Sequence, residues 1–117
     1  MKGFRSLIVW QKSHDLALIV YRSTEGFPKS EQFGVTSQLR RAALSIPTNI
    51  AEGSGRKSNK EYAHFLNIAM GSAHETEYLL EFSKDLNYID ETKVTSLFKQ
   101  IEEIKSMLFV FIKKLNP

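Results

Sequence analysis

Apolar residues recur at nearly strict heptad spacing through the segment 91–115, and this pattern restricts the fold more than any other feature of the chain. The residues concerned are Val94, Leu97, Phe98, Ile101, Ile104, Leu108, Phe111 and Leu115. Such spacing places them along one stripe of an α-helix, which must be buried against other helices. Three more segments, at about 7–23, 31–52 and 59–86, also show a helical period, and no segment alternates as a strand does. The sequence therefore predicts an all-α protein.

Short breaks separate the four predicted helices. They are marked by Gly26, Pro28, Gly53, Gly55, Ser58, Glu61, Asn87 and Asp90. Glycine, proline and a left-handed asparagine end helices, whereas Ser58 with Glu61 forms a capping box and Asp90 is a good N-cap. A chain of 117 residues makes one domain, 1–117. Four helices with short connections favour an antiparallel, up-and-down bundle with left-handed packing.

Pro47 lies inside the second predicted helix. Proline removes one backbone donor and crowds the carbonyl four residues earlier, here that of Ala43. The apolar period nevertheless continues through Pro47 without a change of phase. We therefore expect one helix over 31–52, kinked at Pro47, instead of two helices.

Composition excludes several classes of protein. The chain has no cysteine, which rules out disulfides, thiolate metal sites and cysteine nucleophiles. No apolar run approaches the roughly 20 residues of a membrane span. The N-terminal residues Met1-Lys2-Gly3-Phe4-Arg5 precede no long apolar run or small-residue cleavage site, as a secretory signal would require. We expect a cytoplasmic protein that does not associate with membranes.

No constellation of side chains indicates an enzyme. Glu61 and His64 form a single Glu-x-x-His, whereas a di-iron bundle needs two such pairs and two further glutamates. His64 and His74 share a helical stripe but lie about 15 Å apart along its axis, and His14 has no hydroxyl nucleophile beside it. We expect no catalytic residues, no metal, no cofactor and no small-molecule substrate.

The charges are divided unevenly along the chain. Residues 1–60 contain ten Lys or Arg and four acids, a net +6, whereas residues 61–117 contain six and nine, a net −3. One half could therefore meet an anionic partner. Alternatively, opposite charges on neighbouring helices simply attract one another within the bundle. The sequence leaves both interpretations open.

The connection after the second helix is the most suggestive local feature. Gly53-Ser54-Gly55 followed by Arg56, Lys57 and a helix N-terminus could offer amides, a helix dipole and cations to a phosphate. The alternative is that the glycines merely separate two helices. Arg41 lies on the polar stripe of the second helix. The predicted nucleic-acid contacts are Arg41, Arg56, Lys57 and Lys60.

Some apolar residues lie outside the core stripes of the first two helices. They exceed what a lone bundle can bury, which predicts contact between subunits. Arg40 shares its helical face with apolar residues, an arrangement that suits an interface in which the guanidinium pairs with a carboxylate. The predicted interface residues are Ile8, Ile19, Arg40, Leu44, Pro47 and Ala51.

The run 33–53, FGVTSQLRRAALSIPTNIAEG, resembles the signature of the four helix bundle protein family. Its members are also called 23S rRNA intervening-sequence proteins, because some are encoded within inserts in bacterial 23S rRNA genes. Matching pieces occur at 9–12, 56–58, 65–69 and 88–89, so the resemblance covers nearly the whole chain. It implies a left-handed up-and-down bundle that forms pentameric rings and has no established biochemical role.

A related group of bundles, the accessory proteins of diversity-generating retroelements, forms basic pentamers that contact nucleic acid and a reverse transcriptase. By analogy, we expect a non-enzymatic homo-oligomer, a homopentamer by this resemblance, that binds the phosphate backbone of RNA or DNA. The alternative is a protein-interaction or scaffold module that does not bind nucleic acid.

Overall fold

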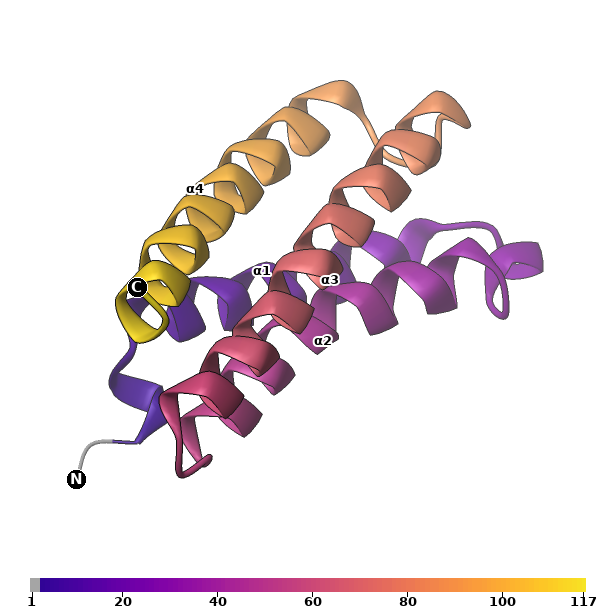
Figure 1. Ribbon diagram of the computed structural model, residues 1–117. Coiled ribbons are helices and arrows are strands. Elements are labelled where there is room, and N and C mark those ends of the chain that lie inside the picture. The colour runs from indigo at the N-terminus through magenta and orange to yellow at the C-terminus, as the bar shows by residue number, and fades with distance from the viewer. Residues whose placement is uncertain (1–2) are drawn as a thin grey trace.

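A computed structural model describes residues 3–117, which form four α-helices and three 3-10 turns and contain no strand (Figure 1). The helices are α1 (Ile8–Ser23), α2 (Val35–Ser54), α3 (Asn59–Asp85) and α4 (Glu91–Leu115). The 3-10 turns are η1 (Phe4–Ser6), η2 (Thr24–Gly26) and η3 (Lys29–Glu31). Met1 and Lys2, which begin the segment assessed above as a secretory signal, lie outside the described residues. The all-α prediction is confirmed.

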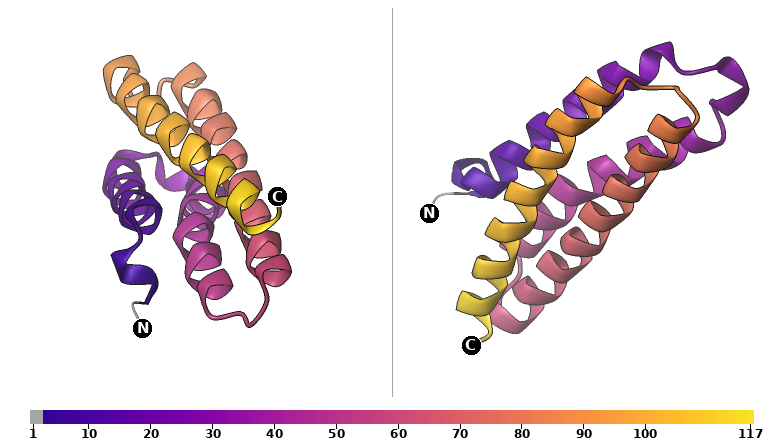
Figure 2. Two further views of the ribbon diagram at one scale, coloured as in Figure 1. Left: turned by 60° about the vertical axis from the view of Figure 1, so that its left-hand side comes forward. Right: turned by 90° about the horizontal axis from the view of Figure 1, so that it is seen from above.

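The helices pack as an elongated bundle of 43 × 23 × 20 Å. Helix α2 lies along α3, α4 returns beside α3, and α1 contacts both α2 and α4. Figure 2 shows that α3 and α4 run side by side, whereas α1 crosses α4 at an angle. No helix within residues 3–117 has the length and hydropathy that crossing a bilayer requires.

The heptad stripe of α4 forms one wall of the core. Val94, Leu97, Ile101, Ile104 and Leu108 are all 0–1% exposed, as the spacing predicts. Two hydroxyl groups inside the core are satisfied by the helix that carries them, whereas the buried Thr36 Oγ1 makes no hydrogen bond within the described chain. The Oγ1 of Thr76 donates to the carbonyl of Ser72 at 2.8 Å, and the Oγ of Ser83 donates to that of Leu79 at 2.7 Å. These bonds offset the desolvation of the hydroxyls.

The predicted helix boundaries around α3 and α4 have the expected chemistry. The Ser58 Oγ accepts from the Glu61 amide at 3.1 Å, and Asp90 accepts from the Lys93 amide at 2.8 Å. Asn87 adopts a φ of 62°, the left-handed conformation that turns the chain after α3. In the described chain the Glu61 carboxylate does not complete the capping box by accepting from Ser58.

Helix α2 begins at Val35, four residues later than predicted, because Glu31 belongs to a 3-10 turn and caps the helix from outside. Its Oε1 accepts from the Val35 amide at 3.3 Å, and its Oε2 accepts from the Tyr88 hydroxyl at 2.9 Å. This second hydrogen bond raises the pKa of Tyr88, with burial adding to the effect. A partner 57 residues away in sequence thus helps to place the start of α2.

Pro47 lies within one uninterrupted helix that ends at Ser54 instead of residue 52. Side chains next to Pro47 bond back to the same helix. The Thr48 Oγ1 donates to the Leu44 carbonyl at 2.8 Å, and the Asn49 Nδ2 donates to the Ser45 carbonyl at 2.8 Å. Neither bond replaces the one that proline removes, which would end on the Ala43 carbonyl, and back-bonding of this kind is typical of bent helices. The kink itself stays a prediction.

Helices α2 and α3 approach closely at Gly53, which is buried. A Cβ at this position would lie 2.9 Å from the Tyr62 Cδ1 and 3.0 Å from the Phe65 Cβ. Glycine is therefore needed there for packing. Gly71, in the middle of α3, has no atom within 4 Å of its potential Cβ and is exposed.

These two glycines give a matched pair of substitutions. We expect Gly53→Ala to lower the free energy of unfolding by about 1–3 kcal/mol, because the new methyl group overpacks the α2–α3 contact. Gly71→Ala should raise it by about 0.5–1 kcal/mol, because alanine favours an exposed helix interior. Urea denaturation of both variants measures the difference, and equal effects of the two substitutions would contradict this account of Gly53.

Candidate nucleic-acid interface

The α2–α3 connection does not present the Gly55 and Arg56 amides to a ligand, so of its two interpretations the separation of two helices agrees with the structure. The Gly55 amide donates to the Glu52 carbonyl at 3.2 Å, and the Arg56 amide donates to that of Gly53 at 3.0 Å. Both bonds close the end of α2, and Gly53 is buried within the helix. A phosphate cradle built on Gly53 and these two amides is therefore wrong, because helix termination already uses them.

The predicted cations of this connection have different surroundings. Arg56 forms an ion pair with Glu52 at 3.4 Å, and its guanidinium lies 4.6 Å from the centroid of the Phe65 ring. Lys57 and Lys60 are exposed, and neither forms an ion pair within the part of the chain that the structure describes. Their ammonium groups are thus available to a phosphate, whereas Arg56 is held by two local contacts.

Arg41 is exposed but does not join the other three predicted cations. It precedes the end of α2 at Ser54 by thirteen positions, which corresponds to about 20 Å along the helix axis. A single phosphate cluster containing all four cations is therefore not formed within one chain.

The last turns of α4, which the sequence reasoning did not connect with a phosphate site, lie at the same end of the bundle as Lys57. The rings of Tyr62 and Phe111 pack at 5.2 Å, which joins the start of α3 to the last turns of α4. Helix α4 carries Lys113 and Lys114 in its last turn. Figure 1 shows the start of α1, the end of α4 and the α2–α3 connection in the left-hand part of the molecule.

This end of the molecule, called here the basic end, carries cations from three segments. They are Arg5, Arg56, Lys57, Lys60, Lys113 and Lys114, and the acids near them are Glu52 and Glu61. The opposite end is formed by the α1–α2 and α3–α4 connections. Its acids are Glu25, Glu31, Asp85, Asp90 and Glu91, and its cations are Arg22, Lys29, Lys84 and Lys93. The charges of the bundle are therefore separated along its length.

Lys113 and Lys114 were missed because they are far from the glycine-rich connection in sequence. The sequence nevertheless contains the information that places these two lysines. In a bundle whose helices alternate in direction, the end of the fourth helix lies beside the start of the third. The predicted topology and the boundary at residue 115 together place two lysines at the same end of the bundle as Lys57 and Lys60.

The residues predicted for a subunit interface have diverse environments. Ile8 is 54% exposed and Leu44 is 46% exposed. Ile19 and Ala51 are half-buried, and Ile19 packs against the core. Pro47 is buried within the single chain, so a second copy could not contact it and its assignment to an interface is wrong.

Arg40 contacts residues of its own chain, and its assignment to a subunit interface stays a prediction. Its Nε donates to the Thr24 Oγ1 at 2.7 Å, and its Nη2 donates to the Tyr21 carbonyl at 3.1 Å. Its guanidinium also lies 4.9 Å from the centroid of the Tyr21 ring. A cation at the C-terminal carbonyls of α1 complements the helix dipole, so Arg40 joins α2 to the end of α1.

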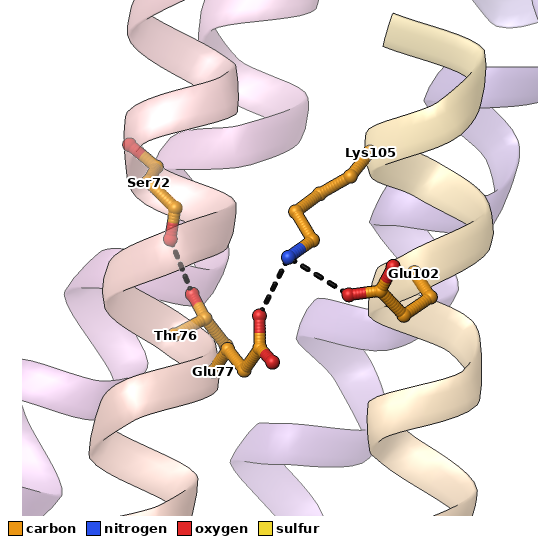
Figure 3. Close-up of polar contacts among 5 residues, drawn as sticks. All are labelled: Ser72, Thr76, Glu77, Glu102 and Lys105. Atoms are coloured by element: carbon orange, nitrogen blue, oxygen red, sulfur yellow. Dashed lines mark hydrogen bonds and ion pairs between the residues drawn. The ribbon is translucent and has the colours of Figure 1, made fainter. Parts of the chain in front are cut away.

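The most enclosed ionic group in the described residues joins α3 to α4 (Figure 3). The Lys105 Nζ lies 2.7 Å from the Glu77 Oε1 and 2.8 Å from the Glu102 Oε1, and its side chain is only 15% exposed. Burial lowers the pKa of Lys105, but the hydrogen bonds and charges of Glu102 and Glu77 outweigh burial and raise that pKa overall. The lysine is neutralised by two carboxylates, which indicates a structural role. Residues 3–117 contain no group of side chains suited to a metal ion.

Fold and surface together define a class, that of all-α bundles with a cationic end. A family model described as 23S rRNA-intervening sequence protein matches residues 5–110. The chain belongs to this family. It is also similar to the 1.70 Å crystal structure of a protein of unknown function from the S23 ribosomal protein family of Bacteroides thetaiotaomicron VPI-5482. That similarity has a TM-score of 0.82 at 30% identity and covers 91% of this chain and 99% of the other. A comparison with curated proteins gave no match.

The ionic group at Lys105 predicts a pH-dependent contribution to stability. Its pKa in the folded chain is raised above the ordinary value of 10.5. The stabilisation that the ion pairs of Lys105 give to the fold is therefore complete below pH 10.5. It is lost as the pH rises through the pKa of Lys105 in the folded chain. At pH 7, Lys105→Met should lower the free energy of unfolding by about 1–3 kcal/mol, between the values for exposed and buried pairs.

Denaturant titrations of the wild type and of Lys105→Met, at pH 7 and above pH 10.5, measure this contribution. The difference between the two proteins should shrink at the higher pH. The exposed residue Lys99 on the same helix provides the control, because Lys99→Met removes a charge without breaking an ion pair of the described chain. A constant difference across the two pH values would show that the charge of Lys105 is not what stabilises the fold.

Proposed function

We propose that this protein is a non-enzymatic, homo-oligomeric bundle that binds the phosphate backbone of RNA or DNA through its basic end. The single observation that carries the proposal is the gathering of cations from the N-terminal segment, the α2–α3 connection and the end of α4. Clustered Lys and Arg side chains displace counterions from a nucleic acid, which favours binding regardless of base sequence.

The surroundings of the aromatic rings support backbone binding over reading of bases. Tyr62, Phe65 and Phe111 lie near the basic end, but each is partly buried, and Phe109, 57% exposed beneath the Lys113 ammonium, is a single exposed ring. Burial also raises the pKa of Tyr62. Proteins that stack single-stranded bases instead expose aromatic rings along a basic groove. The proposed contacts are therefore electrostatic, with Lys57 and Lys60 as the principal donors and Arg56 next to them.

Self-association is the second part of the proposal. Exposed apolar side chains such as Ile8, Leu44 and Tyr78 support it, because burial of such groups favours association. The resemblance described above makes a pentamer the expected form. Five copies of a chain of net charge +3 would carry a formal charge of +15. Association would thus increase the number of phosphates that one particle contacts. The left-handed, up-and-down form of the bundle and a cytoplasmic location belong to the same proposal.

A second candidate function is a protein-interaction module that does not bind nucleic acid. It is favoured by Phe33, which is 90% exposed between η3 and α2. Beside it, Gly34, Tyr78 and Phe82 line a groove of about 370 Å³. An exposed phenylalanine next to an open groove suits a protein partner. Recovery of a stoichiometric protein partner after nuclease treatment would favour this candidate.

The basic end can be tested with a pair of charge-matched variants. Lys57→Glu/Lys60→Glu changes the charge at the basic end, and Lys29→Glu/Lys93→Glu makes the same change at the opposite end. Each phosphate contact contributes about 0.9 to the salt slope on duplexes and about 0.7 on single strands. The first variant should therefore lower the slope by about 1.4–1.8 per chain engaged, whereas the second should leave it nearly unchanged.

The measurement is fluorescence anisotropy with fragments of ribosomal RNA and with duplex DNA over a range of salt concentrations. Wild-type protein that fails to bind at low salt would rule out the nucleic-acid proposal. Equal losses in both variants would show that net charge, and not the basic end, controls binding.

The oligomeric state is a separate prediction. Light scattering coupled to gel filtration should give a mass that is a multiple of 13.4 kDa at micromolar concentration, about 67 kDa for five copies. A mass of one chain under these conditions would contradict self-association. The fluorescence-anisotropy titration would still test whether the basic end binds nucleic acid.

A further inference from the structure

The apolar stripe of α4 is less completely covered at the basic end than in the middle of the bundle. Ile101, Ile104 and Leu108 are buried, whereas Phe111 and Leu115 of the same stripe are only half-buried. Figure 2 shows the reason, since α1 and α4 diverge from their crossing toward the start of α1 and the end of α4. The last turns of α4 are therefore left partly uncovered on the side of α1.

A groove of about 530 Å³ lies between these diverging helices. Its lining is mostly apolar and consists of Leu7, Ile8, Val9, Ser106, Met107, Val110, Phe111 and Lys114. Ile8 is 54% exposed and Val110 is 53% exposed, so both side chains are open to a ligand. A hollow of this size, with apolar walls and few polar groups, is typical of a site for a small molecule.

The two polar side chains of the lining lie at opposite ends of the groove. Ser106 and Lys114 are both exposed and are eight positions apart on α4, which corresponds to about 12 Å along the helix axis. Lys114 forms no ion pair within residues 3–117. The groove is thus an apolar channel with an uncompensated ammonium group at one end.

The neighbours of Lys114 add to the positive potential at that end. Lys113 adjoins it on α4, and Arg5 immediately precedes the segment that starts α1. The first turn of α1 contains no acid, and Leu7 provides no side-chain cap. The positive end of the α1 dipole is therefore not offset by a side chain of that turn.

The nearest acids do not reverse this potential. Glu103 pairs with Lys12 at 2.9 Å, a contact that joins α4 to α1 about one turn beyond the lining. Asp15 follows on α1, on the far side of that ion pair. Glu61 is exposed at the start of α3, where two lysines outnumber it. Among the described residues, no acid lines the groove itself.

We propose that this groove binds an amphiphile with a single alkyl chain and a carboxylate, that is, a free fatty acid. The chain lies against Ile8, Met107 and Val110, where it removes apolar surface from water. The carboxylate meets the Lys114 ammonium, whose alkyl stem follows the apolar wall while its charge stays at the surface. This ligand is bound without reacting, and its binding does not depend on the proposed contact with nucleic acid.

Charge complementarity selects the carboxylate from among apolar ligands. A neutral alkyl chain would gain the same apolar contacts but no ion pair, and a cationic amphiphile would be repelled by Lys114. An exposed ion pair is a modest contribution. The apolar chain therefore supplies most of the affinity, and the ammonium supplies the preference for an anion.

The test compares octanoate with octanol, which has the same chain length but no charge. Nuclear magnetic resonance titrations that follow the methyl groups of Ile8, Met107 and Val110 give a dissociation constant for each probe. Lys114→Glu should raise the constant for octanoate about 3–10-fold, because an exposed ion pair is replaced by repulsion. The constant for octanol should change less than about 2-fold, because its contacts are apolar.

Lys113→Glu is the matched control, since it makes the same charge change at the adjacent position. The Lys113 ammonium lies 5.1 Å from the centroid of the Phe109 ring, and Lys113 does not line the groove. At physiological ionic strength, which screens exposed charges beyond about 8 Å, this variant should change the octanoate constant less than about 2-fold. Val110→Glu, which places a carboxylate in the groove, should abolish octanoate binding. Circular dichroism verifies that the variants are folded.

Three results would overturn the inference. The lining methyl groups could fail to respond to either probe, or Lys113→Glu and Lys114→Glu could weaken octanoate binding equally. Light scattering could also show that Val110→Glu lowers the mass of the wild-type assembly, which would mean that a second copy covers the groove. The proposed binding of nucleic acid is tested separately through Lys57 and Lys60, so its failure and the failure of this inference are distinguishable.

Discussion

The close packing of α2 against α3 is the contact on which the rest of the bundle depends. It rests on small residues, with Gly53 beneath Tyr62 and a hydroxyl pair at Ser45 and Ser72 where larger side chains would separate the helices. Atoms at van der Waals distance gain dispersion energy that a wider gap would forfeit. The seam also fixes the relative height of the two helices. That height places the start of α3, and through Tyr62 the end of α4, at the same end as the α2–α3 connection.

Much of the fold could be predicted because it follows from local rules. The helical period identified the buried stripes, and capping chemistry located the starts of α3 and α4. The start of α2 could not be placed in this way. It depends on the Glu31 carboxylate, which is held by Tyr88 from the far side of the sequence. No window of neighbouring residues contains that contact, so local reasoning set the helix boundary four residues too early.

The candidate site was harder to predict, because a charged side chain shows its role only through its neighbours. From the sequence, Arg40 was assigned to a subunit interface and Arg56 to a phosphate contact. In the structure Arg40 closes the end of α1, and Arg56 lies over Phe65 beside Glu52. Lys57 and Lys60 keep their predicted exposure. The convergence of Lys113 and Lys114 with them follows from topology, which a search confined to contiguous motifs does not consider.

The uneven division of charge along the sequence has a consequence in space, because along the length of the bundle it makes one end basic. The cations there are Lys57, Lys60 and the α4 lysines. The self-association proposed above would reinforce phosphate binding, since a polyanion gains from every additional cation it meets at once.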